Sequence, residues 1–253
     1  MDWGKAKTVL ILSFLFLNVL LGYQLWSTGW GKSETNTTYV IQETNELLAS
    51  KNIQLNVEEV PSDSPLLKSF TVRYDEPSMN ASKQRLNTPI PMGNPFNKNF
   101  SRDLMAQTPV RHADRYEIDL IRSGNGVYVF NQMVDRIPLF DSNLKLYEEN
   151  DQIVAYKQTY VEVQSGGEQQ EQRVISAYTA IRRLAENYLA EGSVIIDVKL
   201  GYHGTSFESE TQYMLPFWRI MLSDGSPYYV QAYNGEVDEP REPLQLPKDN
   251  LDG

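Results

Sequence analysis

The sequence contains no cysteine and only two histidines, and its 33 acidic residues outnumber its 23 basic ones. The absence of cysteine excludes disulfides, thiolate metal sites, thiol catalysis and a lipid-modified N-terminal cysteine. The formal charge of −10 argues against sequence-independent nucleic-acid binding, which needs a cationic surface to displace counterions. Hydrophobic residues still make up 41% of the chain, so the composition predicts a folded protein with a sizeable core.

Long apolar runs are also missing, except at the start of the chain. The mean hydropathy is −0.45, yet residues 8–26, TVLILSFLFLNVLLGYQLW, contain no charged residue. As a helix this segment would span roughly 28 Å, close to the hydrocarbon thickness of a bilayer. We therefore expect a single transmembrane anchor over residues 8–26.

Charges on the two sides of this segment predict its orientation. Lys5 and Lys7 precede it, and the next basic residue is Lys32. Since lysine and arginine are in excess on the cytoplasmic side, residues 1–7 are expected inside and the rest of the chain outside the cell. A cleaved signal peptide is the alternative, but no A-x-A-like site follows, and aromatic residues continue to Trp30 as they do at a membrane interface.

One side of the expected anchor carries a candidate contact with another helix. Ile11, Leu15, Asn18 and Gly22 recur at helical spacing and share a face. An amide within a bilayer gains on the order of 1 kcal/mol from a partner on a neighbouring helix, and glycine allows a close approach. Alternatively, Asn18 bonds its own backbone. We predict that these four residues bind a partner within the membrane.

The remainder predicts an extracytoplasmic α+β domain of antiparallel sheet packed with helices. Residues 27–37 are small and polar and indicate a stalk, residues 38–238 the domain, and residues 239–253 a C-terminal tail. Residues 76–110, rich in proline and asparagine, indicate a long loop. Two lobes, 38–110 and 111–238, are an alternative organisation of the domain.

Local patterns predict individual elements of this domain. Alternation predicts strands in 53–60 and 66–74, hairpins over 116–130 and 144–163, and strands at 194–202 and 212–222. Residues 173–191 have the periodicity of an amphipathic helix, which Gly192 would end. The turns Asp224-Gly225 and Asn234-Gly235 bound a last strand over 227–233.

Motifs for chemistry are scarce. His112 and His203 have no metal-ligand spacing and are expected to be structural or surface residues. The Ser-x-x-Lys spacing at Ser142 lacks the other motifs of penicillin-binding proteins and is attributed to chance. No nucleophile elbow, phosphate-binding loop or dinucleotide fingerprint is present. We predict a protein that is not an enzyme and that uses no cofactor and no metal.

The hairpin that contains PFWRI is the most strongly patterned part of the domain. It predicts a core hairpin or, alternatively, an exposed aromatic surface for a partner, formed by Trp218, Tyr228 and Tyr229.

The chain resembles a known family in several segments. These are the opening MDWGKAKTVLILSFLFLNVLLGYQLW, the segment RVISAYTAIRRLAENYL, the following GYHG, and PFWRI before the last hairpin. They are similar to YycI (WalI), the membrane-anchored regulator of the WalK/WalR two-component system of Gram-positive bacteria. The last hairpin alone also resembles the end of PepSY-type domains.

The resemblance to YycI implies a single-pass membrane protein without catalytic residues. It implies that the chain acts with a YycH-like protein, associates with the sensor kinase WalK partly through its transmembrane helix, and tunes kinase activity in homo- or hetero-oligomers. The competing hypotheses are a membrane-tethered binding module for a cell-wall ligand and a PepSY-like inhibitor of a secreted hydrolase.

Overall fold

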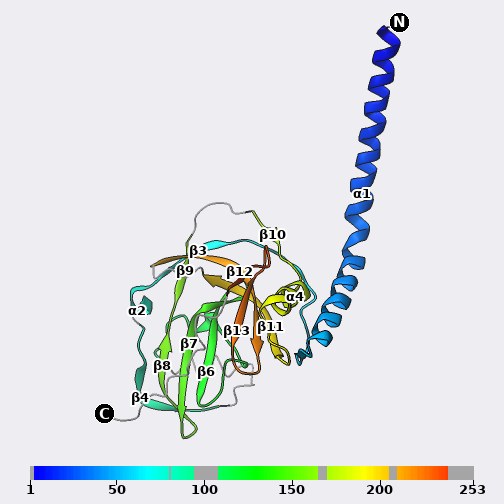
Figure 1. Ribbon diagram of the computed structural model, residues 1–253. Helices are drawn as coiled ribbons and strands as arrows, with labels where there is room; N and C mark the ends of the chain where they lie inside the picture. Colours follow the sequence, from blue (N-terminus) through cyan, green and yellow to red (C-terminus); the bar gives the residue numbers. More distant parts are fainter. Residues whose placement is uncertain (1–2, 80, 94–107, 165–169, 205–209, 239–253) are drawn as a thin grey trace. The chain divides into compact units, whose positions relative to one another are not determined.

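The computed structural model describes residues 3–79, 81–93, 108–164, 170–204 and 210–238; within its first helix, the side chains of residues 5, 6, 9 and 24–37 are not described. The chain divides into two compact units, residues 1–47 and 48–253. The first consists of most of helix α1, Trp3–Ser50, whose backbone is helical through the segment predicted as a stalk (Figure 1). The tail 239–253 lies outside the described residues.

The second unit is built on a mixed β-sheet. Its helical elements are α2 Glu76–Met79, η1 Ala113–Arg115 and α4 Ala177–Asn187. Its strands are β1 Gln54–Leu55, β2 Leu66–Leu67, β3 Phe70–Tyr74, β4 Gln84–Pro91, β5 Tyr116–Ile118, β6 Val127–Val134, β7 Ile137–Glu149, β8 Gln152–Gln158, β9 Val161–Val163, β10 Gln172–Arg173, β11 Val194–Gly204, β12 Thr211–Leu222, β13 Pro227–Gln231 and β14 Val237–Asp238. The α+β class is therefore confirmed.

The sheet differs from the antiparallel one that was expected. Its main path runs β14-β13-β12-β11-β7-β6-β5. Most neighbours are antiparallel, but β11 pairs in parallel with both β1 and β7. Parallel pairs need long connections, and here the partners lie far apart in sequence. Residue-by-residue alternation could not reveal them.

The alternative division into lobes 38–110 and 111–238 is not found. Strands β1, β3 and β4 precede residue 110, and they pair with β11, β12 and β8, which all follow it. Because both halves contribute to one sheet, they form a single folded unit.

Strand pairs and one chain connection together form a circuit in the sheet. Strand β7 pairs with β11, β11 with β12, β12 with β3, and β3 with β9. Strand β9 follows directly from β8, which pairs back with β7. A compact apolar cluster contains residues from this circuit, namely Phe70, Val72, Leu139, Val161, Tyr202 and Met214. A second cluster lies under β4–β8 and includes Phe130, Leu144, Leu146 and Ile153.

Helix α4 begins later and ends earlier than the predicted 173–191 helix. Gln172 and Arg173 form β10 instead, and the Ser176 hydroxyl caps the helix by accepting from the Thr179 N–H at 3.2 Å. At the other end, the Lys51 ammonium donates to the carbonyls of Ala185 and Glu186 at 2.6 and 2.9 Å. These carbonyls lack partners within the helix, so a cation from outside it satisfies them.

The segment 76–110 contains more structure than the predicted loop. Strand β4 pairs with β8 through Gln84, Arg85, Ile90 and Pro91, with an irregular register between Arg85 and Ile90. Two prolines in this strand confine it to a sheet edge, and they also hid it from the sequence pattern. Residues 94–107 of the predicted loop lie outside the described residues.

The predicted hairpins are confirmed in the β5–β6 and β7–β8 pairs and in the turn at Gly225. The β7–β8 turn, Asn150-Asp151, was recognised by its polar residues without a glycine. The β6–β7 hairpin was missed, because its turn Asp135-Arg136 contains neither glycine nor asparagine, although both residues have positive φ, 50° and 66°.

Candidate functional site

The four residues predicted to contact a partner helix share one side of α1. Ile11 and Leu15 are 63% and 59% exposed, and the space around Gly22 is open. The Asn18 side-chain amide donates to the Phe14 carbonyl at 2.9 Å, which is the backbone-bonded alternative. One amide hydrogen is thus satisfied inside the helix, while the amide oxygen remains an acceptor for a partner. The structure contains a single chain, so partner binding by this face stays a prediction.

The expected membrane span is not established by the structure. Among the residues whose side chains are described, no helical stretch is both long and apolar enough to cross a bilayer.

The prediction that Trp218 forms part of an exposed aromatic surface on the last hairpin is wrong, because this residue is buried. Trp218 is fully buried, and its indole N–H donates to the Ile175 carbonyl at 2.9 Å. It therefore belongs to the core and cannot present a surface to a partner. Tyr228 and Tyr229 are only partly buried, and their proposed contact with a partner stays a prediction.

A buried ion network is centred on Arg219, which belongs to this hairpin. Arg219, on β12, is fully buried and forms ion pairs with Asp119 and with Asp197, the latter at 2.8 Å. The guanidinium also lies over the Phe140 ring at 4.9 Å. The Asn131 amide donates to Asp119 at 2.8 Å, so the carboxylate has partners from two elements. This network connects β12 to β11, β6 and the segment after β5.

Burial and charge act in opposite directions on this network. Burial alone would raise the pKa of Asp119, but the hydrogen bonds and charge of Arg219 outweigh it and lower the pKa. Burial would likewise lower the pKa of Arg219, and its two carboxylate partners raise it. Both groups therefore remain charged at neutral pH inside the protein.

His203 lies in a second cluster on the same face of the sheet. Its Nδ1 is 2.8 Å from an Asp141 oxygen, and its Nε2 is 3.5 Å from Asp238 on β14. The ring stacks on Tyr229 with centroids 4.2 Å apart and meets the edge of Phe217. The expectation that His203 is structural agrees with this enclosure, although its two carboxylate neighbours are far away in sequence and were not predicted.

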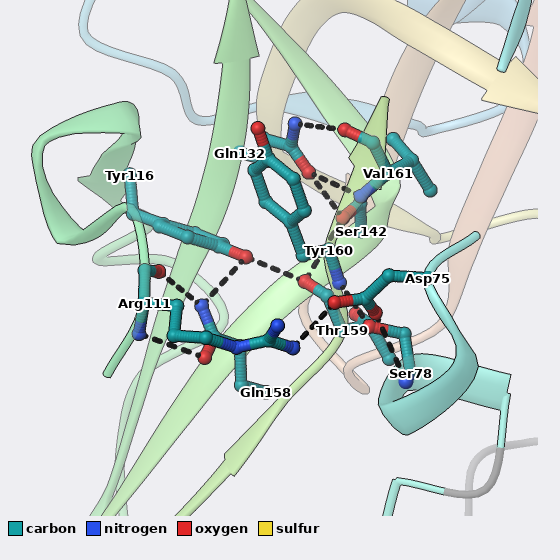
Figure 2. Close-up of polar contacts among 10 residues, drawn as sticks. All are labelled: Asp75, Ser78, Arg111, Tyr116, Gln132, Ser142, Gln158, Thr159, Tyr160 and Val161. Carbon is teal, nitrogen blue, oxygen red and sulfur yellow. Dashed lines mark hydrogen bonds and ion pairs between the residues drawn. The ribbon is translucent and has the colours of Figure 1, made fainter. Parts of the chain in front are cut away.

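A third polar cluster fixes the junction between β8 and β9 (Figure 2). The buried Gln132 side chain donates to the Val161 carbonyl at 2.7 Å and accepts from the Val161 N–H at 3.0 Å. The side-chain amide thus replaces the backbone of a neighbouring strand. The Ser142 hydroxyl donates to the same Gln132 oxygen at 2.7 Å. The contact with the Gln132 side chain supports the sheet where β9 leaves the neighbourhood of β7.

The outer part of this cluster is less buried. Arg111 pairs with Asp75, and the Gln158 amide donates to the Arg111 carbonyl at 2.6 Å. The Ser78 hydroxyl accepts from the Tyr160 N–H at 2.7 Å (Figure 2). These contacts attach the α2 segment to the end of β8 and have no nucleophile–base geometry. Ser142, whose Ser-x-x-Lys spacing was attributed to chance, serves the structural contact with Gln132.

Comparison with known proteins places the chain in a family. The sequence model of the YycI protein family matches residues 35–233, most of the chain. The chain belongs to the YycI family. This identification confirms the resemblance seen in the sequence, and it rests largely on the folded domain because the match begins at residue 35.

Two other comparisons add little to the YycI identification. No curated protein matches the chain. Among solved structures, an uncharacterized protein from Eubacterium rectale ATCC 33656 is similar, with 9% identity, a TM-score of 0.44, and coverage of 74% of this chain and 91% of that one.

YycI proteins are a regulatory family and are not known as enzymes. In the buried ion network of this YycI chain Arg219 pairs with Asp119 and Asp197, while Arg219 Nε and Asn131 Oδ1 have no hydrogen-bond partner among the described residues. In the described part of the chain, no group of three or more histidine, aspartate or glutamate side chains could hold a metal ion.

The His203 cluster predicts a pH-dependent stability. Burial would lower the pKa of His203, but the hydrogen bond and charge of Asp141, with Asp238 adding to them, raise it above 6.5. Because protonated His203 is favoured in the folded state, it stabilises the fold fully at pH values below the unfolded-state pKa near 6.5. This stabilisation is lost as the pH rises through the folded-state pKa. The difference in unfolding free energy between wild type and His203→Gln should therefore shrink from pH 6 to pH 8. Urea titrations at each pH measure it, and a constant difference would contradict the assignment.

Proposed function

We propose that this YycI-family chain is a membrane-anchored, non-enzymatic regulator that modulates the sensor kinase WalK together with a YycH-like protein. The observation that carries the proposal is the family match over residues 35–233. Membership in this family points to regulation of the WalK/YycG system, and the partners and the mode of contact are the proposed part.

Helix α1 supports the membrane part of the proposal. The described apolar side chains between Leu10 and Leu21 are exposed, from 45% for Leu21 to 71% for Leu10. A continuous exposed apolar surface of this kind is unfavourable in water and favourable in a bilayer. Residues 8–26 form the anchor, with residues 1–7 in the cytoplasm and the domain outside.

The regulatory step requires a difference in affinity. A helix that binds both states of the kinase equally well shifts nothing, so the α1 contact must favour one state. Ile11, Leu15, Asn18 and Gly22 supply that contact in this proposal, because the face is exposed and carries the polar and small residues that join helices in membranes. The folded domain adds contacts outside the membrane.

The test replaces Asn18 and Gly22 by leucine. The double variant Asn18→Leu/Gly22→Leu should co-purify with WalK about fivefold less, since it loses about 1 kcal/mol of polar contact and the close approach at glycine. Phe16→Leu, on another side of α1, is the matched control and should behave as wild type. Quantitative pulldown from detergent-solubilised membranes, with a WalR-dependent reporter, measures both effects. Unchanged association and unchanged reporter output would remove the α1 contact from the proposal.

A further inference from the structure

One face of the sheet gathers positive charge in a protein whose formal charge is −10. Lys145 on β7 lies directly opposite Lys157 on β8. Ala155, two residues before Lys157 and on the same side of β8, lies opposite both Tyr147 and Arg85. Directly opposed residues share a face, so Lys145, Lys157 and Arg85 project from the same side. Lys83 joins them, with its ammonium 4.2 Å from the centroid of the Tyr147 ring. We call Lys83, Arg85, Lys145 and Lys157 the cationic face.

The lysines at its centre have no acidic partner in the described part of the chain. Among the described residues, neither Lys145 nor Lys157 forms an ion pair or a hydrogen bond, and the side chains are only partly exposed. Burial and the charges of Arg122 and Lys157 lower the pKa of Lys145. Like charges directly opposite each other destabilise a sheet. No carboxylate among the described residues offsets this repulsion between Lys145 and Lys157.

The surroundings of the cationic face indicate an extended ligand. Strands β7 and β8 lie side by side with β4 along the edge (Figure 1). Edge strand β4 bonds to β8 only near its two ends, and its residues 87–89 are exposed between them. The cations follow one another from β7 through β8 to β4, with neighbouring strands about 4.8 Å apart, so a ligand that reaches all of them must lie extended across these strands. The opposite side of these strands is the apolar cluster around Leu144 and Leu146.

We propose that the cationic face is a docking surface for an extended acidic segment of a partner protein. Charge complementarity indicates that the ligand carries carboxylates, which would pair with Lys145 and Lys157 and relieve their mutual repulsion. The choice of a protein partner rests on the proposed regulatory function. Attraction between opposite charges accelerates association and rejects partners that carry positive charge.

The test uses the full chain in neutral-detergent micelles and a fluorescein-labelled poly-glutamate peptide, followed by anisotropy at low salt. Wild type should bind, and Lys145→Gln/Lys157→Gln should bind on the order of tenfold more weakly. The matched control Lys68→Gln/Arg73→Gln removes the same charge from exposed positions near β3 and should retain affinity within about twofold. Lys145→Arg/Lys157→Arg keeps the charge and should retain binding.

Several outcomes would overturn the proposal. They are no binding by wild type, an equal loss in the control pair, and binding to phosphatidylglycerol vesicles in place of the peptide. The unfolding midpoint of the glutamine variant should equal or exceed that of wild type, because the repulsion is gone; binding lost together with a lower midpoint counts as support only if the arginine variant binds. The peptide assay contains no kinase, so a negative result says nothing about the α1 contact with WalK. That contact is tested separately by the pulldown.

Discussion

Replacing Asp119 by alanine should lower the free energy of unfolding of the domain by about 3–5 kcal/mol. Arg219 is fully buried, and its Nη2 lies 3.2 Å from one Asp119 oxygen while Nη1 pairs with the other. Without Asp119 the guanidinium stays in the interior with Asp197 as its remaining carboxylate partner. Removing one member of a buried pair is costly because the other charge is left without full compensation.

The measurement can use fluorescence in the second unit. Trp218 is the sole tryptophan of residues 48–253 and is fully buried, so its emission reports unfolding in urea. The control is Arg111→Ala, which removes an ion pair whose arginine side chain is 55% exposed and should cost no more than about 1 kcal/mol. The replacement of both buried partners, Asp119→Leu/Arg219→Met, should restore much of the stability lost in Asp119→Ala. A cost for Asp119→Ala as small as the control's would contradict this account.

Gly201→Ala should destabilise the same unit by about 2–3 kcal/mol. Gly201 lies on β11, and the nearly buried ring of Phe140 covers it, so that an added Cβ would collide with three ring carbons, including Cε1 at 2.8 Å. The ring has little freedom to retreat because Tyr229 lies 5.7 Å away and the Arg219 guanidinium lies over it. Overpacking in a close-packed interior forces such shifts.

A second substitution tests the cause of this effect. In the Gly201→Ala background, Phe140→Leu removes the carbons that collide and should be less costly than in wild type, which a double-mutant cycle of unfolding free energies measures. Gly124→Ala is the control, since Gly124 has open space around it and should change stability by less than about 0.5 kcal/mol. Additive effects of the Gly201 and Phe140 substitutions would show that the two residues do not collide.

Sequence reasoning identified the elements whose signals are local. Glycine turns at Gly126 and Gly225 and the alternation of β11 and β12 predicted strands close to the observed ones. The parallel pairing of β11 with β7 was missed, because it depends on which strands meet and not on their own patterns. The boundaries of α4 were also missed, since Gln172 and Arg173 pair with β2 and the C-terminal carbonyls of the helix accept from Lys51, and both partners are remote in sequence.

The polar clusters were harder to predict than the strands. His203 and Asp141 are 62 residues apart, and Arg219 and Asp119 are 100 apart, so no motif spacing links them. The alternation of the PFWRI segment correctly suggested a core strand at Trp218, but the aromatic residues alone could not separate core from surface. The shared face of Ile11, Leu15, Asn18 and Gly22 on α1 follows from helical spacing and was predictable. Whether this face binds a partner is tested by the pulldown.

The circuit formed by the strand pairs and the β8–β9 connection imposes an order on the folding of the chain. Strand β1 pairs with residues 194–195, and β3 pairs with residues 161–163 on one side and 211–214 on the other, so the first strands to be synthesised wait for partners that are made much later. Contacts between residues so far apart in sequence form slowly, because a long loop must close first. During that interval Phe70 and Val72, which are buried at the end, remain exposed to other chains. A nascent chain that stops before β12 lacks the strand that joins β11 to β3 and therefore has no complete core, which makes it a substrate for chaperones and proteases.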